Sequence, residues 1–144
     1  MTALCEIAIQ DDADADAALV AEIESWLRGV LADLAPTAQS FGVRLAGDDE
    51  VRQLNARLRG TDAPTDVLSF PGEPTPEGLH LGDVLISLPV ARRQATLAGH
   101  GLRRELEELL LHGILHCLGH DHETDGGEME RLELELRQRW VCDD

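Results

Sequence analysis

The sequence predicts a single domain of the α/β class, in its α+β form, in which a small mixed β-sheet of about four strands packs with about five helices. Its 144 residues are enough for one domain with a full hydrophobic core. Strand-like and helix-like patterns follow one another in the order β-α-β-α-β-β-α-α-α, which is typical of a sheet covered by helices. Because no repeat, low-complexity tract or linker interrupts this order, residues 1–144 are expected to form one unit.

Two strand–helix pairs are expected in the first part of the chain. Residues 4–9, LCEIAI, alternate as a strand, and the acidic run DDADAD then precedes a helix that ends at Pro36, since acidic groups near a helix start complement its dipole. Residues 41–45 alternate as a second strand, and Gly47 leads into a short helix. The apolar positions of the first helix recur at helical spacing: Leu19, Ile23, Trp26, Leu27, Val30, Leu31 and Leu34.

Two further strands are expected in the middle of the chain. DVLSF, residues 66–70, lies between Pro64 and Pro71 and is expected at a sheet edge, because proline cannot donate a ladder hydrogen bond. The stretch PGEPTPEG that starts at Pro71 is expected to be a loop on its composition. VLISL, residues 84–88, is a continuous apolar run, which is typical of a strand buried on both faces.

Three helices are expected to complete the domain. Pro89 suits the first turn of the first of them, and His100-Gly101 breaks that helix. A long helix follows from about Leu102 to Leu118. The last helix carries an apolar stripe: Met129, Leu132, Leu136 and Trp140.

The charge distribution limits how RNA could bind. The formal net charge is −16, and all 12 basic residues are arginines. Residues 51–104 carry seven arginines against five acids, whereas acids dominate on either side of that segment. The overall field repels RNA, so RNA would have to bind locally, where arginine is well suited to phosphate. A coding bias toward arginine with a solvated acidic surface is the plainer explanation of the composition.

Cysteine usage and hydropathy favour a cytoplasmic protein without membrane association. No apolar run approaches the roughly 20 residues that cross a bilayer. The N-terminal stretch has no basic region followed by a long apolar one, so no signal peptide is expected. Cys5, Cys117 and Cys142 are odd in number and widely spaced, which suits a reducing compartment.

The stretch HGILHCLGHDH, residues 112–122, predicts a metal site. His112 and His116 are four residues apart on the expected long helix, so they share one face and can reach one ion at about 2.0–2.1 Å per Zn–N bond. Gly119 allows the chain to leave the helix in a left-handed conformation, after which His122 can return as a third ligand. Three imidazoles leave one position of tetrahedral Zn²⁺ open, which favours a catalytic site over a structural one.

The same histidine spacing, with Glu after the first His and a later Met, marks a group of zinc proteases. Here Gly113 stands where those proteases have their general base, so a different substrate is expected. Met129 fits core packing better than a place beneath the metal. His120 is expected to be a turn residue and Cys117 a small core residue.

These segments resemble those of a known family. HGILHCLGHDH is similar to the HGxLHLxGYDH motif of the YbeY-type proteins, which are described as zinc-dependent, single-strand-specific endoribonucleases of rRNA maturation. LNARLRGTDAPTDVLSFP at 54–71 and LGDVLIS at 81–87 resemble further segments of that family in the same order, so that the resemblance covers about two-thirds of the chain. The departures remove no ligand, but His120 in place of the usual Tyr puts any role of that Tyr in doubt.

The resemblance implies an endoribonuclease that cuts single-stranded RNA in rRNA maturation, at the 3′ end of 16S rRNA, and in ribosome quality control. It implies one Zn²⁺ per chain on His112, His116 and His122, with Arg59 and His116 as catalytic residues. The implied partners are single-stranded RNA or rRNA and the ribosome or ribosomal proteins, with no membrane and no DNA. The chain is thus interpreted as one metal-dependent ribonuclease-like domain.

Several alternatives stay open. Arg59 is a sensible candidate because a guanidinium stabilises the charge that builds on phosphate oxygens, but Arg57 competes with it. The general base could be His120, hydroxide supplied by the metal, or the RNA 2′-OH, and either water or the 2′-OH could attack. Two rival functions are a non-catalytic, zinc-stabilised ribosome-assembly factor and a metal-dependent hydrolase of another substrate, which Gly113 disfavours.

Four polar residues near the expected site have plain structural explanations. Glu105 and Glu108 are expected to be solvent-exposed, with orientation of a ligand imidazole as the alternative. Asp66 and Ser69 are expected to serve strand capping and pleat alternation, with a place in the substrate groove as the alternative.

Overall fold

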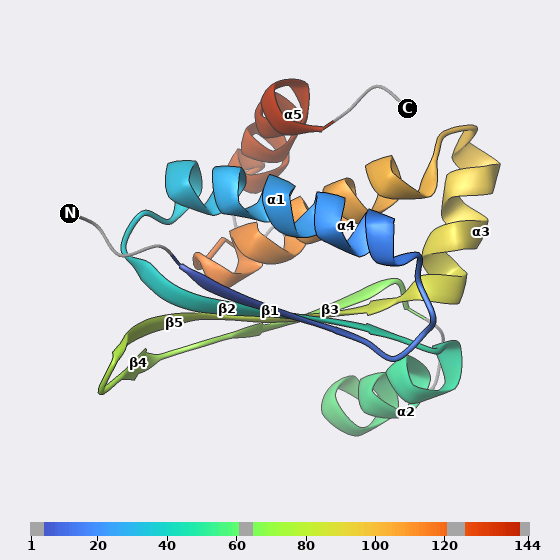
Figure 1. Ribbon diagram of the computed structural model, residues 1–144, viewed down its shortest axis with the longest axis horizontal. Helices are drawn as coiled ribbons and strands as arrows, with labels where there is room; N and C mark the ends of the chain where they lie inside the picture. The colour runs from blue at the N-terminus through green and yellow to red at the C-terminus, as the bar shows by residue number, and fades with distance from the viewer. Residues whose placement is uncertain (1–4, 61–64, 121–125, 142–144) are drawn as a thin grey trace.

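The fold confirms the expected α+β domain. The computed structural model describes residues 5–60, 65–120 and 126–141. Figure 1 shows one β-sheet with α1, α4 and α5 on one side and α2 on the other, while α3 lies at one end. The elements in chain order are β1 Glu6–Asp11, α1 Ala17–Leu34, β2 Ala38–Ala46, α2 Asp48–Arg59, β3 Val67–Pro71, β4 Pro74–Thr75, β5 Gly78–Ser87, α3 Leu88–Ala98, α4 Leu102–Cys117 and α5 Glu128–Trp140.

The sheet is mixed, as expected. Its strand order is β1-β2-β5-β3, with β4 beside β5. β1, β2 and β5 run parallel, which the intervening helices permit, and β3 and β4 run antiparallel to β5. β3 occupies the edge, as its flanking prolines indicated, and its Ser69 pairs with Val84 of β5.

The expected loop and the last expected strand need correction. The sheet has five strands rather than about four, because Pro74–Thr75 forms the short β4 inside the stretch expected to be a loop. β5 starts at Gly78, well before the apolar run 84–88, and Leu88 already belongs to α3. The Thr75 hydroxyl donates a 2.7 Å hydrogen bond to the Gly78 carbonyl, which closes the turn between β4 and β5. So short a strand leaves no hydrophobic alternation to detect.

Helix ends follow from local chemistry. Asp16 caps α1 by accepting a 2.8 Å hydrogen bond from the Ala18 N–H. Ser87 caps α3 in the same way, accepting from the Val90 N–H, and Pro89 lies in the first turn as expected. Gly99 ends α3 at φ +77°, a left-handed conformation that favours glycine.

Two hydrophobic cores lie on opposite faces of the sheet. The smaller one lies under α2 and consists of Ala46, Val51, Leu68 and Leu85. The larger one lies between the sheet and the other helices, and Met129 is part of it at 1% exposure, which confirms its expected core role. Helix α4 is central to the larger core through its buried apolar residues: Leu106, Leu109, Leu110, Leu111, Ile114 and Leu115.

Gly113 brings α4 unusually close to the sheet. A Cβ atom on Gly113 would lie 2.7 Å from Val84 Cγ2 and 3.1 Å from Ser69 Oγ, so no side chain fits there unless the Val84 side chain shifts. The histidine-bearing helix therefore packs directly on two strands.

Among the residues that the structure describes, no helix has both the length and the apolar character that crossing a membrane requires.

Candidate metal centre

His112 and His116 converge on the exposed side of α4. Their Nε2 atoms lie 3.1 Å apart, and their ring planes are inclined at 71° with centroids 4.7 Å apart. Two imidazole nitrogens that bind one ion at about 2.0–2.1 Å, with tetrahedral angles, lie roughly 3.3 Å apart. The observed pair therefore fits two ligands of a single metal ion.

The end of α4 forms the expected turn. Gly119 has φ +99°, and its N–H donates to the His116 carbonyl at 3.0 Å. The N–H of His120 donates to the Leu115 carbonyl at 3.0 Å, so His120 lies in the turn as expected. His122 lies outside the described residues, so its place as the third ligand stays a prediction.

Glu133 of α5 contacts Nδ1 of His112, the ring nitrogen that does not face His116. Its Oε1 lies 2.5 Å from His112 Nδ1, and Arg137 Nη2 lies 3.0 Å from Glu133 Oε2. The Glu133 side chain is only 13% exposed. No sequence pattern indicates this contact, because Glu133 is one of several glutamates on α5 and only the packing of α5 on α4 distinguishes it.

The environment of Glu133 favours its charged form. Burial raises the pKa of this carboxyl, but the hydrogen bond from His112 and favourable electrostatic interactions with His112, Arg137 and His116 together outweigh that effect and lower the pKa. The net result is a pKa below the ordinary value, so Glu133 is an anion at neutral pH.

His100, Glu105 and Glu108 form a second group that could hold a metal ion, with donor atoms within 4.8 Å of one another. The side chains of Glu105 and Glu108 are 10% and 15% exposed, so the expectation that both are solvent-exposed was wrong. Both already have partners: His100 Nε2 donates to Glu105 at 2.8 Å, and Arg137 Nη1 lies 3.5 Å from Glu108. Burial of these acids is explained by this network of hydrogen bonds and ion pairs.

A cavity of about 310 Å³ joins the two groups. Its lining includes His112, Glu133, Glu105, Glu108 and Asp66. Asp66, for which strand capping was the plainer expectation, therefore lies in the same hollow as the first predicted ligand.

The remaining predicted residues lie on α2 and β3. Arg59 is the last residue of α2, and its side chain lies outside the part that the structure describes, so the choice between Arg59 and Arg57 stays a prediction. Ser69 of β3 points toward α4 and borders Gly113. The structure thus brings His112 and His116 together and leaves Arg59 and His122 undetermined.

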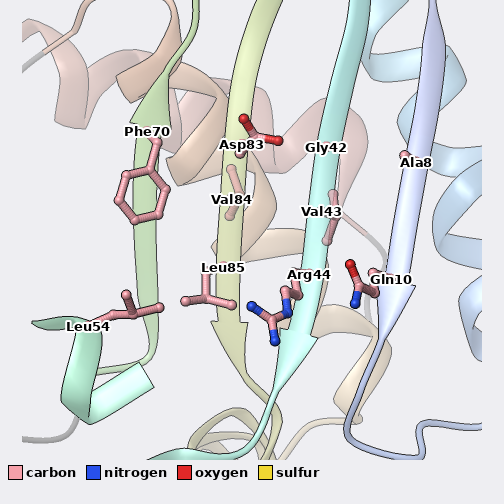
Figure 2. A pocket seen from close by; sticks show the side chains of 10 residues that line it. All are labelled: Ala8, Gln10, Gly42, Val43, Arg44, Leu54, Phe70, Asp83, Val84 and Leu85. Atoms are coloured by element: carbon pink, nitrogen blue, oxygen red, sulfur yellow. The ribbon is translucent and has the colours of Figure 1, made fainter. Parts of the chain in front are cut away.

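A second hollow, of about 280 Å³, lies on the other face of the sheet beside α2. Figure 2 shows Phe70, Leu54, Leu85 and Arg44 around it, with Asp83 at one end. Among its described lining residues, Asp83 is the only side chain of a type that commonly binds metals. The two predicted metal ligands that the structure describes lie on α4 and not around this hollow.

Cys117, next to His116, is half-buried and packs against the larger core, as expected for a small core residue. Its Sγ lies 3.9 Å from the Phe70 carbonyl oxygen, and burial, with a smaller contribution from the charge of Asp83, raises its pKa to about 11 from 9.0.

We expect the thiolate fraction of Cys117 at neutral pH to be roughly 100-fold lower than that of an ordinary cysteine. The folded protein should therefore react with iodoacetamide at Cys117 at least ~100-fold more slowly than the protein unfolded in urea. Peptide mass mapping after timed labelling measures this rate, and equal rates in the native and unfolded states would contradict the assignment.

The comparisons with known proteins identify a family for this chain. The family model described as "Endoribonuclease YbeY" matches residues 6–141. A protein named Endoribonuclease YbeY from Aquifex aeolicus is 46% identical over 116 residues, which are 80% of this chain and 77% of that protein. One of the same name from Nautilia profundicola is 48% identical over 100 residues, 69% of this chain and 71% of that protein.

A solved structure supports the fold independently. The solution structure of TM1509 from Thermotoga maritima has a TM-score of 0.61 and 26% sequence identity, and the match covers 93% of this chain and 91% of that chain. The family model spans both the paired histidines and the strands beneath them. The resemblance seen in the sequence is thereby confirmed, and this chain belongs to the endoribonuclease YbeY family.

Proposed function

We propose that this protein is a metal-dependent endoribonuclease that cuts single-stranded RNA in rRNA maturation, including the 3′ end of 16S rRNA, and in ribosome quality control. Family membership supports the endoribonuclease activity. The single observation that carries the proposal is the pair of imidazoles on α4, whose Nε2 atoms approach to 3.1 Å at the edge of a cavity. One face of one helix thus offers two metal donors beside space for a substrate.

His112, His116 and His122 would hold the metal, and Zn²⁺ is the first choice for three imidazoles, at one per chain. Such an ion would lower the pKa of a water molecule or polarise a phosphoryl oxygen of the substrate. Arg59 would bind and neutralise the scissile phosphate, because a guanidinium in a water-poor site stabilises the charge that develops on the non-bridging oxygens. Asp66 and Ser69, on or beside the edge strand β3, would border the path of the RNA.

The partners follow from the same chemistry. The segment 51–104, which includes Arg59, is the one where arginines outnumber acids, whereas the whole chain carries −16. RNA would therefore bind along a limited path and would gain affinity from a ribosomal surface that supplies further contacts. We place this action in the cytoplasm, in keeping with the unpaired, widely spaced cysteines.

One assay tests the proposal and separates it from a non-catalytic role in ribosome assembly. Labelled single-stranded RNA is incubated with wild type, with protein stripped of metal by a chelator, with the same protein reloaded with Zn²⁺, and with the variants Arg59→Ala and Arg57→Ala. We expect cleavage to disappear on stripping and to return on reloading. Arg59→Ala should reduce cleavage about 10²–10³-fold, because it removes one charge-stabilising group, while Arg57→Ala should retain most of it.

The outcomes differ between the candidate functions. Equal cleavage by the wild type and the stripped protein would indicate a contaminating nuclease and would overturn the proposal. If Arg59→Ala weakened RNA binding while no sample cleaved RNA, the protein would be a zinc-stabilised binding factor instead. A matched double-stranded RNA tests the preference for single strands.

A further inference from the structure

Helix α5 places the carboxylate of Glu133 next to His112, the first predicted metal ligand. Glu133 Oε1 lies 2.5 Å from His112 Nδ1, whereas His112 Nε2 faces His116. We infer that Glu133 is a positioning residue for the metal centre: it holds His112 in the form protonated on Nδ1 and fixes the ring so that Nε2 presents its lone pair. This inference rests on the proposed metal site and assigns a role to a residue outside the ligand motif.

The hydrogen-bonding capacity of the two groups determines which nitrogen of His112 carries the proton. An ionised carboxylate only accepts hydrogen bonds, so the short contact requires a proton on His112 Nδ1. In a neutral imidazole the other nitrogen, Nε2, is then unprotonated and carries a lone pair, which is the state that a metal ligand needs. The same Nε2 lies 3.1 Å from Nε2 of His116, so the lone pair is directed to the point that both rings share.

Glu133 is itself held in place. Arg137, one turn later on α5, places Nη2 3.0 Å from Glu133 and Nη1 3.5 Å from Glu108 of α4. This guanidinium therefore ties the carboxylate of α5 to the same helix that bears the histidines. The Glu133 side chain is 13% exposed, so water competes weakly for its hydrogen bond.

Other glutamates of α5 provide a contrast. Glu135 lies two residues away on the same helix and is exposed. Its replacement changes the net charge by the same amount without touching His112. Glu135→Gln is therefore the matched control for Glu133→Gln.

The test measures metal affinity and the tautomer of His112 rather than RNA cleavage. Zn²⁺ affinity is obtained by competition with a chromogenic chelator for wild type, Glu133→Ala, Glu133→Gln and Glu135→Gln. We expect Glu133→Ala to bind Zn²⁺ about 10–100-fold more weakly, as losses of hydrogen bonds behind metal ligands commonly do, and Glu135→Gln to match the wild type. Glu133→Gln should fall between them, because its amide oxygen can still accept from Nδ1–H.

Nitrogen-15 NMR of the imidazole rings gives the second readout. In the metal-free wild type, His112 should show a protonated Nδ1, and Glu133→Ala should shift the population toward protonated Nε2. Unchanged affinity and an unchanged tautomer in Glu133→Ala would overturn the inference. If Glu133→Ala does not fold, the same two measurements on Glu133→Gln decide the question. A wild type that binds no Zn²⁺ through His112 would instead overturn the proposed metal site.

Discussion

His116→Ala is expected to lower cleavage of single-stranded RNA on the order of 10³-fold and to remove most of the bound Zn²⁺. His116 lies opposite His112 at 3.1 Å between Nε2 atoms, so its loss removes one of two observed donors from the site. A metal that stabilises transition-state charge contributes several kcal/mol, and about 4 kcal/mol corresponds to 10³-fold in rate. Elemental analysis of the purified protein and initial cleavage rates measure the two effects.

His80→Ala is the control for this prediction. His80 of β5 is also partly exposed, but the hydrogen bonds of its ring go to Ser40 of β2 and Asp83 of β5, each at 2.8 Å. We expect His80→Ala to keep both its Zn²⁺ and its cleavage rate within about two-fold of the wild type, since among the described residues His80 shares no partner with the predicted ligands. A His116→Ala protein that retains Zn²⁺ and cuts RNA at the wild-type rate would refute the assignment of this ligand.

Gly113→Glu is expected to destabilise the fold by about 3 kcal/mol or more and to create no peptidase activity. The substitution restores the His-Glu sequence of the zinc proteases, but a side chain on Gly113 points into the contact with Val84 and Ser69. Val84 is 1% exposed and β-branched, so it yields little. A carboxylate buried there without a partner adds a desolvation penalty of several kcal/mol to the overpacking.

Urea unfolding followed by tryptophan fluorescence measures the loss, since Trp26 of α1 donates a 2.6 Å hydrogen bond to the Trp140 carbonyl of α5 and so reports on the core. Gly113→Ala should cost only about 1–2 kcal/mol, because its better helix propensity offsets part of the clash. Leu97→Glu adds the same carboxylate to a helix surface at a site that is 87% exposed, and it should change stability by less than about 0.5 kcal/mol. Comparable stability of Gly113→Glu and the wild type would contradict the close packing described here.

Hydrophobic periodicity was enough to predict the order of helices and strands, because each long element buries one face. The continuous run at 84–88 predicts a strand, but the start of β5 at Gly78 was not predictable from hydrophobicity, since residues 78–83 mix half-buried, buried and exposed positions without a regular alternation. β4 was missed because two residues held by a turn contact carry no pattern. Proline at 64 and 71 was sufficient to predict that β3 lies at the edge.

Some features of the candidate site were likewise predictable from the sequence, and others were not. The spacing of His112 and His116 follows from the helical repeat, and the left-handed turn at Gly119 follows from residue type, so both were predictable. Glu133 and Glu105 were not, because their burial depends on how α5 and the His100 turn pack on α4. The sequence shows that Gly113, and not a glutamate, follows His112, but only the structure shows that residue 113 faces the sheet.

Helix α4 serves two purposes at once: its buried leucines and Ile114 build the interior, and the opposite side carries His112 and His116. Because the two histidines stand on the helix that builds the interior, the candidate metal centre cannot unfold while the rest of the domain survives. Heat inactivation and cooperative unfolding should coincide, and a mutation that loosens the interior will alter the chemistry even when it lies far from any RNA.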